Sequence, residues 1–111
     1  MGAGKRNRLL EILRRDSVRD EANDLIDDWI VIGKAWGSIK FVSGLSAIKA
    51  GAEQEITKAS IRLTYRRNIE MGMRLRHGSD VYEVDAILPD EERRRHVDLV
   101  CRKLAQREIG P

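Results

Sequence analysis

The clearest pattern in the chain is the alternation Ala59-Ser60-Ile61-Arg62-Leu63-Thr64-Tyr65. Apolar and polar side chains change places at every residue, so that one side of the segment is apolar and the other is polar. This period of two is typical of a β-strand that is buried on one side only. The segment therefore predicts a half-buried strand.

The same alternation continues further along the chain. Residues 73–77 alternate in this way, and Gly78-Ser79 offers a tight reversal because glycine accepts positive φ. Residues 82–88 alternate again, which predicts a hairpin over 73–88, and residues 97–101 repeat the pattern. Four strands in about 45 residues, joined by short turns, predict a mainly β fold, either a meander or a small barrel.

Residues 18–30 allow two interpretations. Apolar residues recur there at helical spacings of three and four, which indicates an amphipathic helix. They are Ala22, Leu25, Ile26, Trp29 and Ile30. The runs at 29–32 and 39–42 instead favour strands, and Gly33 and Gly37 would interrupt a long helix. Local pattern leaves helix and strand both open.

Residues 43–58 form a long connection between the two halves. Small residues and alanine dominate it, which predicts a short helix or a long mobile loop framed by Gly44 and Gly51. Long connections are unusual in a small β domain and often carry function. We therefore expect a flexible, functional loop at about residues 43–58.

Length and composition limit the chain to a modest core. A chain of 111 residues has room for one domain, spanning residues 1–111. Aromatic residues make up only 5% and charged residues 35%, so that the core has to be aliphatic and lean. A core of this kind favours additional burial against copies of the same chain.

Cysteine content and hydropathy restrict the environment. The lone Cys101 cannot form an intrachain disulfide and lies in an apolar stretch, which predicts a small buried hydrophobe. The longest apolar run, residues 29–32, is too short to span a membrane, and no apolar signal segment follows the basic N-terminus. We expect assembly in a reducing cytoplasm and no membrane partner.

No recognisable catalytic or metal-binding pattern occurs in the sequence. His77 and His96 are 19 positions apart and have no second ligand at a zinc-binding spacing. The serines lack a base partner or a GxSxG setting. The acidic run 90–92 is followed directly by three arginines, as in a solvated turn. We therefore expect no enzyme, no metal and no cofactor.

Charges are segregated along the chain, although the net charge is only +3. Residues 1–15 are mainly basic, residues 16–28 are mainly acidic, and residues 61–76 hold five arginines against one glutamate. Such blocks suit a subunit whose basic side meets an acidic neighbour or DNA. Solvated faces are the alternative explanation.

The arginines after residue 60 are candidate contact residues. Like charges on one sheet face cost stability unless an anionic group lies opposite, and phosphates or an acidic partner surface would supply it. Only Tyr65 and Tyr82 lie nearby, too few for a platform that stacks bases. The residues predicted to face an interface or phosphates are Arg62, Arg66, Arg67, Arg74 and Arg76.

Several short motifs follow one another in a familiar order. They are Ala35-Trp36-Gly37-Ser38-Ile39, Ile61-Arg62-Leu63-Thr64-Tyr65-Arg66, Met73-Arg74-Leu75-Arg76-His77-Gly78, Val81-Tyr82-Glu83-Val84 and Asp90-Glu91-Glu92-Arg93-Arg94-Arg95. Together they resemble the head-tail joining, or head-closure, family of long-tailed phages and prophages over about residues 4–104. Residues 16–28 depart from the family, because they lack the glycine that its first turn usually contains.

The resemblance implies a fold and a task. The fold would be a small, partly open β-barrel with a long inserted loop and short helical content. The protein would be a structural virion component at the head-tail junction, forming a homo-oligomeric ring that closes the DNA-filled head and offers a docking surface to the tail. Its partners would be the portal or adaptor proteins, the tail proteins and, nonspecifically, packaged DNA.

The resemblance also implies that the loop rearranges on assembly and helps to close the channel. Carried onto this chain, the channel-gating residues are Gly44, Leu45, Ser46, Lys49, Gly51 and Glu53, with the two glycines as hinges. Two alternatives stay open at this point. One is a small basic nucleic-acid-binding β-barrel, and the other is a different connector or tail-terminator subunit of a phage.

Overall fold

The computed structural model describes residues 7–42, 46–49, 52–55 and 57–109. Strands make up most of this part of the chain, and one four-residue helix lies near its C-terminal end. The elements are β1 (Arg8–Arg19), β2 (Leu25–Val42), β3 (Ser46–Lys49), β4 (Ala52–Glu55), β5 (Lys58–Thr64), β6 (Arg74–His77), β7 (Asp80–Pro89), β8 (His96–Lys103) and α1 (Gln106–Ile109). Within these residues, no helix is long and apolar enough to cross a membrane.

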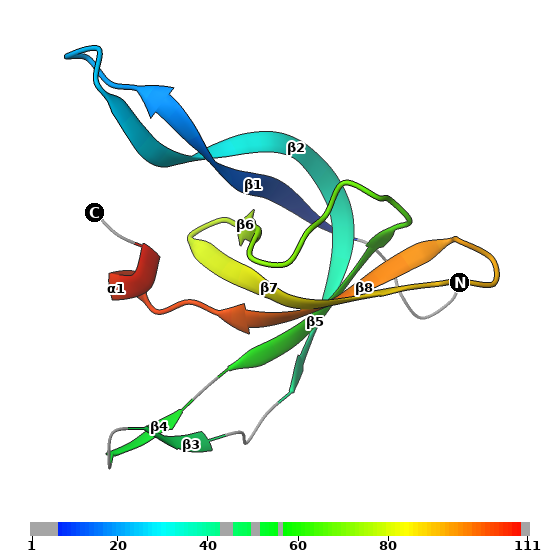
Figure 1. The fold of residues 1–111 in the computed structure, drawn as a ribbon. Coiled ribbons are helices and arrows are strands. Elements are labelled where there is room, and N and C mark those ends of the chain that lie inside the picture. Colours follow the sequence, from blue (N-terminus) through cyan, green and yellow to red (C-terminus); the bar gives the residue numbers. More distant parts are fainter. Residues whose placement is uncertain (1–6, 43–45, 50–51, 56, 110–111) are drawn as a thin grey trace.

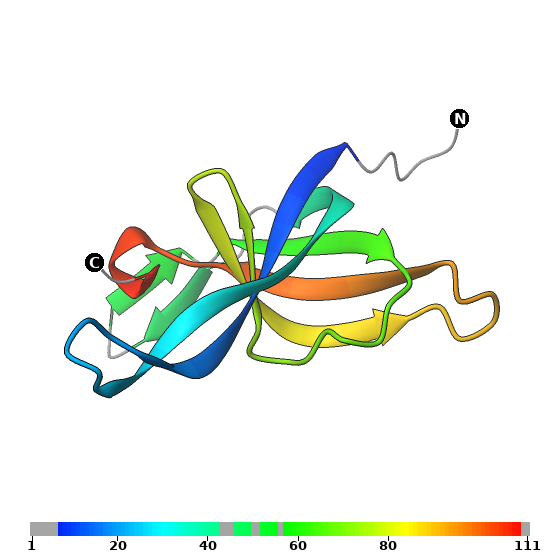
Figure 2. The ribbon, with the colours of Figure 1, turned by 90° about the horizontal axis from the view of Figure 1, so that it is seen from above.

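Six of the strands form a closed antiparallel barrel in the order β1-β2-β5-β8-β7-β6 (Figures 1 and 2). The short strand β6 closes it by pairing with β7 on one side and with β1 on the other. The mainly β fold and the small barrel predicted from the sequence are confirmed. The barrel is closed rather than partly open, because residues 11–13 of β1 reach β6.

The core fills the inside of the barrel with aliphatic side chains. The three alternating segments predicted from the sequence form β5, the β6–β7 hairpin and β8, and most of their apolar residues point inwards. In β7 the predicted alternation is wrong after a register shift between Val84 and Ala86, because Ile87 packs against the core there and Leu88 is exposed. Cys101 is fully buried among the inward-pointing residues, as predicted. The core cluster comprises Leu10, Ile12, Ala59, Ile61, Leu63, Ile69, Met73, Leu75, Tyr82, Val84, Val97, Leu99 and Cys101.

Gly37 on β2 also faces the core, where there is no room for a side chain. A Cβ atom at this position would lie 2.6 Å from Leu63 Cδ2, 2.8 Å from Leu10 Cδ1 and 2.9 Å from the backbone oxygen of Arg62. Glycine here lets β2 approach β5 closely, which is a recognised use of glycine within a strand.

Residues 25–42 form one long strand, so the helical interpretation of residues 18–30 is wrong. β1 and β2 pair continuously from Arg8↔Gly37 to Arg19↔Leu25, with a register shift between Ile12 and Leu13. Pairing along twelve residues of β1 satisfies the backbone of both strands and outweighs the local helical spacing. Beyond the barrel, the β1–β2 hairpin continues as a two-stranded ribbon (Figure 1).

The hairpin reverses at residues 20–24 without a glycine. Asn23 takes the left-handed conformation (φ 65°), which asparagine accepts more readily than most residues. The Asp20 carboxylate accepts hydrogen bonds from the backbone N–H of Ala22 (3.0 Å) and of Asp24 (2.9 Å). Asp20 and Asn23 therefore stabilise this turn in place of the glycine that the resembled family usually has there.

The insertion between β2 and β5 contains a second hairpin. β3 and β4 pair from Ser46↔Glu55 to Lys49↔Ala52, so the short-helix interpretation of this segment is wrong for residues 46–49 and 52–55. This hairpin forms a two-stranded sheet of its own, in which the backbone groups pair with each other. Figure 1 shows this hairpin projecting from the barrel. The helical content lies in α1 instead.

Candidate functional site

Ion pairs across neighbouring strands order the outer face of the barrel. Arg62 on β5 lies directly opposite Asp98 on β8, and its guanidinium donates from Nε to Oδ1 (2.7 Å) and from Nη2 to Oδ2 (3.0 Å). This hydrogen bonding raises the pKa of Arg62 above its ordinary value. The anionic group opposite Arg62 is therefore supplied by the chain itself.

Arg76 is paired in the same way at the seam that closes the barrel. It lies opposite Glu11, and its Nε donates to Glu11 Oε1 at 2.7 Å. The hydrogen bond from Arg76 lowers the pKa of Glu11. Arg62 and Arg76 lie on strands that are not neighbours in the barrel. β5 lies between β2 and β8, whereas β6 lies between β1 and β7.

Arg102 on β8 is a contact residue that sequence reasoning missed. Its Nη1 donates to Glu108 Oε2 (2.9 Å) and its Nη2 to Glu83 Oε1 (3.3 Å), so that it joins β7 and α1 to β8. The hydrogen bond to Glu108 is the main cause that raises the pKa of Arg102. Arg102 follows Cys101 in an alternating segment, so that its side chain should face outwards. This alternation was the feature of the sequence that could have identified Arg102 as a contact residue.

The other predicted arginines have separate surroundings. Arg66 follows β5 and donates from Nε to Asn68 Oδ1 at 3.0 Å, and the neighbouring Arg67 is exposed. Arg74 lies on β6 two residues before Arg76, on the same side of that strand. The structure therefore brings Arg74 and Arg76 together, and it places the remaining three at other positions.

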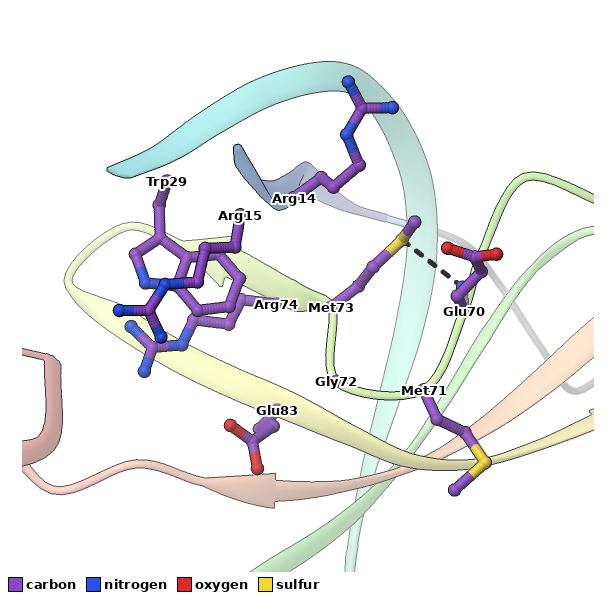
Figure 3. A pocket seen from close by; sticks show the side chains of 9 residues that line it. All are labelled: Arg14, Arg15, Trp29, Glu70, Met71, Gly72, Met73, Arg74 and Glu83. Carbon is purple, nitrogen blue, oxygen red and sulfur yellow. Dashed lines mark hydrogen bonds between the residues drawn. The ribbon is translucent and has the colours of Figure 1, made fainter. Parts of the chain in front are cut away.

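A pocket of about 330 Å³ lies where the β1–β2 ribbon leaves the barrel (Figure 3). Trp29 on β2 lies at one side of it, with the Arg74 guanidinium carbon 4.1 Å from the ring centroid and that of Arg15 at 5.9 Å. Both distances fit cation–π contacts. Arg14 and Met71 complete this part of the lining. Arg15 and Trp29 face each other in the β1–β2 register, a relation that the sequence alone did not reveal.

The guanidinium of Arg74 has an acceptor for one of its N–H groups and, among the described residues, none for another. Its Nη2 donates to the backbone oxygen of Glu108 at 3.4 Å. Its Nε is buried and meets no acceptor among the residues that the structure describes. A guanidinium fixed over a tryptophan ring is suited to bind a carboxylate or a phosphate through its terminal N–H groups.

Three of the predicted channel-gating residues lie in the β3–β4 hairpin, away from this pocket. Ser46 and Lys49 belong to β3 and Glu53 to β4, where Glu53 pairs with Ile48. Gly44, Leu45 and Gly51 lie outside the described residues. The backbone of the hairpin thus brings the three described positions into one small two-stranded sheet.

Neither the histidines nor the cysteine forms a reactive cluster in the described part of the chain. No three His, Cys, Asp or Glu side chains gather there in a way that could hold a metal ion. His96, the first residue of β8, lies 3.8 Å from Asp90 and 3.9 Å from Asp98. Burial raises the pKa of Cys101 to about 12, so that its thiol stays protonated.

These features define the chain as a small β-barrel protein. Its closed six-stranded barrel carries a ribbon, an inserted hairpin and a basic, aromatic pocket, which are surfaces suited to contacts with other molecules. The sequence model of the family described as phage head completion protein matches residues 1–104. The chain belongs to this family, and it is therefore a structural protein of head completion, a component of a phage particle.

Solved structures share the fold. A protein of Shigella flexneri 2a, determined in solution, is 26% identical and superposes with a TM-score of 0.70, covering 96% of this chain and 99% of that chain. A chain from the virion of a native gene transfer agent particle is 18% identical, with a TM-score of 0.64 over 88% of this chain and 94% of that chain. Among curated proteins, no significant sequence match was found.

Proposed function

We propose that this protein forms a homo-oligomeric ring below the portal or adaptor, where it closes the DNA-filled head and presents a docking surface to the tail. The observation that carries the proposal is membership of the head completion family across residues 1–104. The mechanism is steric and electrostatic, and it makes or breaks no covalent bond. A ring suits this task because it multiplies weak contacts and leaves no free edge.

Exposed apolar side chains support an assembled state. Leu9 on β1 and Trp36 on β2 face each other on the outside of the barrel, and Trp36 is 56% exposed. Phe41 and Leu88 are also more than half exposed. Neighbouring exposed apolar residues of this size are typical of surfaces that another protein covers. They also agree with the lean core expected from the composition.

The β3–β4 hairpin is the proposed channel element. It projects from the barrel, so that in a ring of copies such hairpins could converge on a common axis (Figure 1). Gly44 and Gly51 are the proposed hinges, and Ser46, Lys49 and Glu53 are the proposed contacts, together with Leu45. Deleting the hairpin while joining β2 to β5 by a short turn would test this role through leakage of DNA from otherwise normal heads.

The contacts of the arginines favour a structural role over nucleic-acid binding. Arg62 and Arg76 already meet carboxylates of the same chain at 2.7 Å, so a phosphate would have to displace Asp98 or Glu11. A groove for single strands would also need aromatic side chains that stack successive bases. The family match likewise favours a head completion protein over a tail terminator.

Electron microscopy of particles assembled without this protein tests the proposed function. We expect full heads that lose their DNA, together with unattached tails. Stable, tailed particles formed in the absence of the protein would contradict the proposal. Supplying the wild-type chain from a plasmid is the control, and it should restore joined particles.

A further inference from the structure

We propose that the pocket beside Trp29 receives the acidic tip of the β1–β2 ribbon of a second copy of this chain, so that copies join head to tail. We call residues 14–30 the arm, because they extend beyond the last contact of β1 with β6. The inference rests on the proposed ring and names the contact that would build it. It assigns no role to the β3–β4 hairpin.

The pocket is positively charged and pre-arranged. Arg74 is stacked on Trp29 with its guanidinium carbon 4.1 Å from the ring centroid. In the described part of the chain, no ion pair holds Arg15 or Arg74, whereas Arg14 is paired with Asp16 at 3.1 Å. Figure 3 shows Arg15 and Arg74 gathered at the Trp29 ring. A carboxylate placed there would meet two guanidinium groups at once.

Two carboxylates line the pocket, Glu70 and Glu83, and among the described residues neither forms an ion pair with Arg15 or Arg74, although Glu83 lies opposite Arg74 in the register of β6 and β7. Glu83 points towards Arg102, which binds it at 3.3 Å. Glu70 lies at the other side of the pocket, where its backbone N–H donates to Met73 Sδ at 3.3 Å (Figure 3). The charge of Arg15 and Arg74 therefore remains available to a partner.

The tip of the arm has the complementary chemistry. Residues 20–28 contain five carboxylates and no basic residue. Asp20 is used inside the turn, where it accepts the N–H groups of Ala22 and Asp24. Glu21 and Asp24 are exposed at the outer end of the turn. Both carboxylates can therefore enter a pocket without disturbing the turn that presents them.

Apolar side chains accompany the charges on both surfaces. Leu25, directly after the turn, is 64% exposed, and Met71 at the rim of the pocket is 68% exposed. A contact that pairs carboxylates with arginines and leucine with methionine has both a polar and an apolar part, as stable protein interfaces do.

A chain cannot satisfy its own pocket. The pair Arg15↔Trp29 is separated from the end of the ribbon, Arg19↔Leu25, by four paired positions. Four residues of extended strand span about 14 Å, and the paired ribbon cannot fold back over that length. Tip and pocket are different surfaces of one chain, so the contact is heterologous. Heterologous contacts generate closed rings when the rotation between copies closes.

Disulfide trapping in assembled particles tests the contact. The full chain would carry Asp24→Cys in the tip and Met71→Cys at the pocket rim, two substitutions at exposed positions. Cys101 is fully buried and does not compete. After mild oxidation of purified particles, we expect a ladder of cross-linked multimers on a non-reducing gel. The matched control joins Met71→Cys with Glu91→Cys on the exposed β7–β8 turn, and it should give monomers only.

Charge reversal provides a second and independent readout. Arg15→Glu should lower the amount of protein per particle about fivefold or more, the factor that one lost charge-assisted contact corresponds to. Combining Arg15→Glu with Asp24→Arg exchanges the charges of this one pair while Arg74 stays in place, and it should restore part of the amount. Arg93→Glu, on the β7–β8 turn, is the control and should have no effect.

The outcomes separate this inference from the proposed function. Normal incorporation of the cysteine variant without cross-links overturns the inference and leaves the proposed function standing. Loss of incorporation with Arg15→Glu that Asp24→Arg does not restore also overturns it, because the pocket then binds another anion such as a DNA phosphate. Absence of the wild-type protein from joined particles overturns both proposals.

Discussion

At the scale of single residues, contacts between residues of neighbouring strands stabilise the barrel on both its outer and its inner face. On the outer face, Arg62 and Asp98 join β5 to β8, and Glu11 and Arg76 join β1 to β6. Opposite charges at directly paired positions stabilise the register of the two strands. On the inner face, the decisive residue is Gly37, which has no space for a side chain. The outer contacts therefore support the register, and the inner one permits close packing.

Replacing Gly37 by alanine should destabilise the barrel by about 1–3 kcal/mol, because the new Cβ would press against a backbone oxygen as well as Leu10 and Leu63. Urea unfolding, followed by tryptophan fluorescence, measures the change. Gly33→Ala on the same strand is the matched control, since a Cβ there meets nothing within 4 Å. Equal losses in the two variants would contradict the steric explanation.

At the scale of elements, the β1–β2 hairpin forms the projecting arm, and the β1–β6 seam closes the barrel. The hairpin supplies two barrel strands and then continues as the arm, whose turn depends on Asp20 and Asn23. The seam closes the barrel through only three paired residues of β1. Short seams and solvent-exposed turns are the parts of a protein that open most easily. Substitutions in them should therefore act locally.

Asn23→Val should loosen the turn without unfolding the barrel. A β-branched residue at φ 65° costs about 1–2 kcal/mol, so the amides of Ala22 and Asp24 should exchange their hydrogens about five- to thirtyfold faster. Hydrogen exchange measured by NMR reports this directly. Asn23→Gly keeps the left-handed conformation accessible and should leave the exchange of both amides close to that of the wild type.

The Glu11–Arg76 pair should make the seam sensitive to acid. The folded-state pKa of Glu11 lies below its ordinary value of 4.5, so its stabilising contribution is complete above pH 4.5 and is lost as the pH falls through the lower folded value. We expect the free energy of unfolding to fall over this range and to fall less in Glu11→Gln. Unfolding curves at a series of pH values test this, with Glu91→Gln as the control.

At the scale of the whole molecule, two projections extend the barrel in space. The Cα radius of gyration is 15.6 Å, whereas a compact chain of this length has about 13 Å. The arm and the β3–β4 hairpin both project from the barrel (Figure 1). A shape of this kind offers large contact surfaces for its size. It agrees with a protein that completes its burial against neighbours.

Trp36→Ser should separate folding from assembly. Trp36 is 56% exposed on the outer face, so its loss should change the free energy of unfolding by less than about 0.5 kcal/mol. Under the proposed function, the same change should reduce incorporation into particles. Unfolding curves and quantitative immunoblots of purified particles measure the two effects. A large loss of stability, or unchanged incorporation, would show that Trp36 is not an assembly contact.

Local pattern was sufficient for the strands after residue 58, because each has a buried and an exposed face and so a clear period of two. It was insufficient for residues 18–30, where helical spacing and strand-forming residues coexist. The arm lies outside the barrel and is exposed on both faces near its tip, so no buried face imposes the period of two there. Pairing with β1 decided the outcome.

The sequence by itself determined the class of fold, most of the buried positions from residue 59 onward and the family resemblance, since all three depend on neighbouring residues and their order. Only the tertiary structure decided barrel closure, the partners of the arginines and the pocket at Trp29. Arg62 and Asp98 are 36 positions apart, and Glu11 and Arg76 are 65 apart. Contacts over such separations depend on strand order and register, which no local pattern specifies.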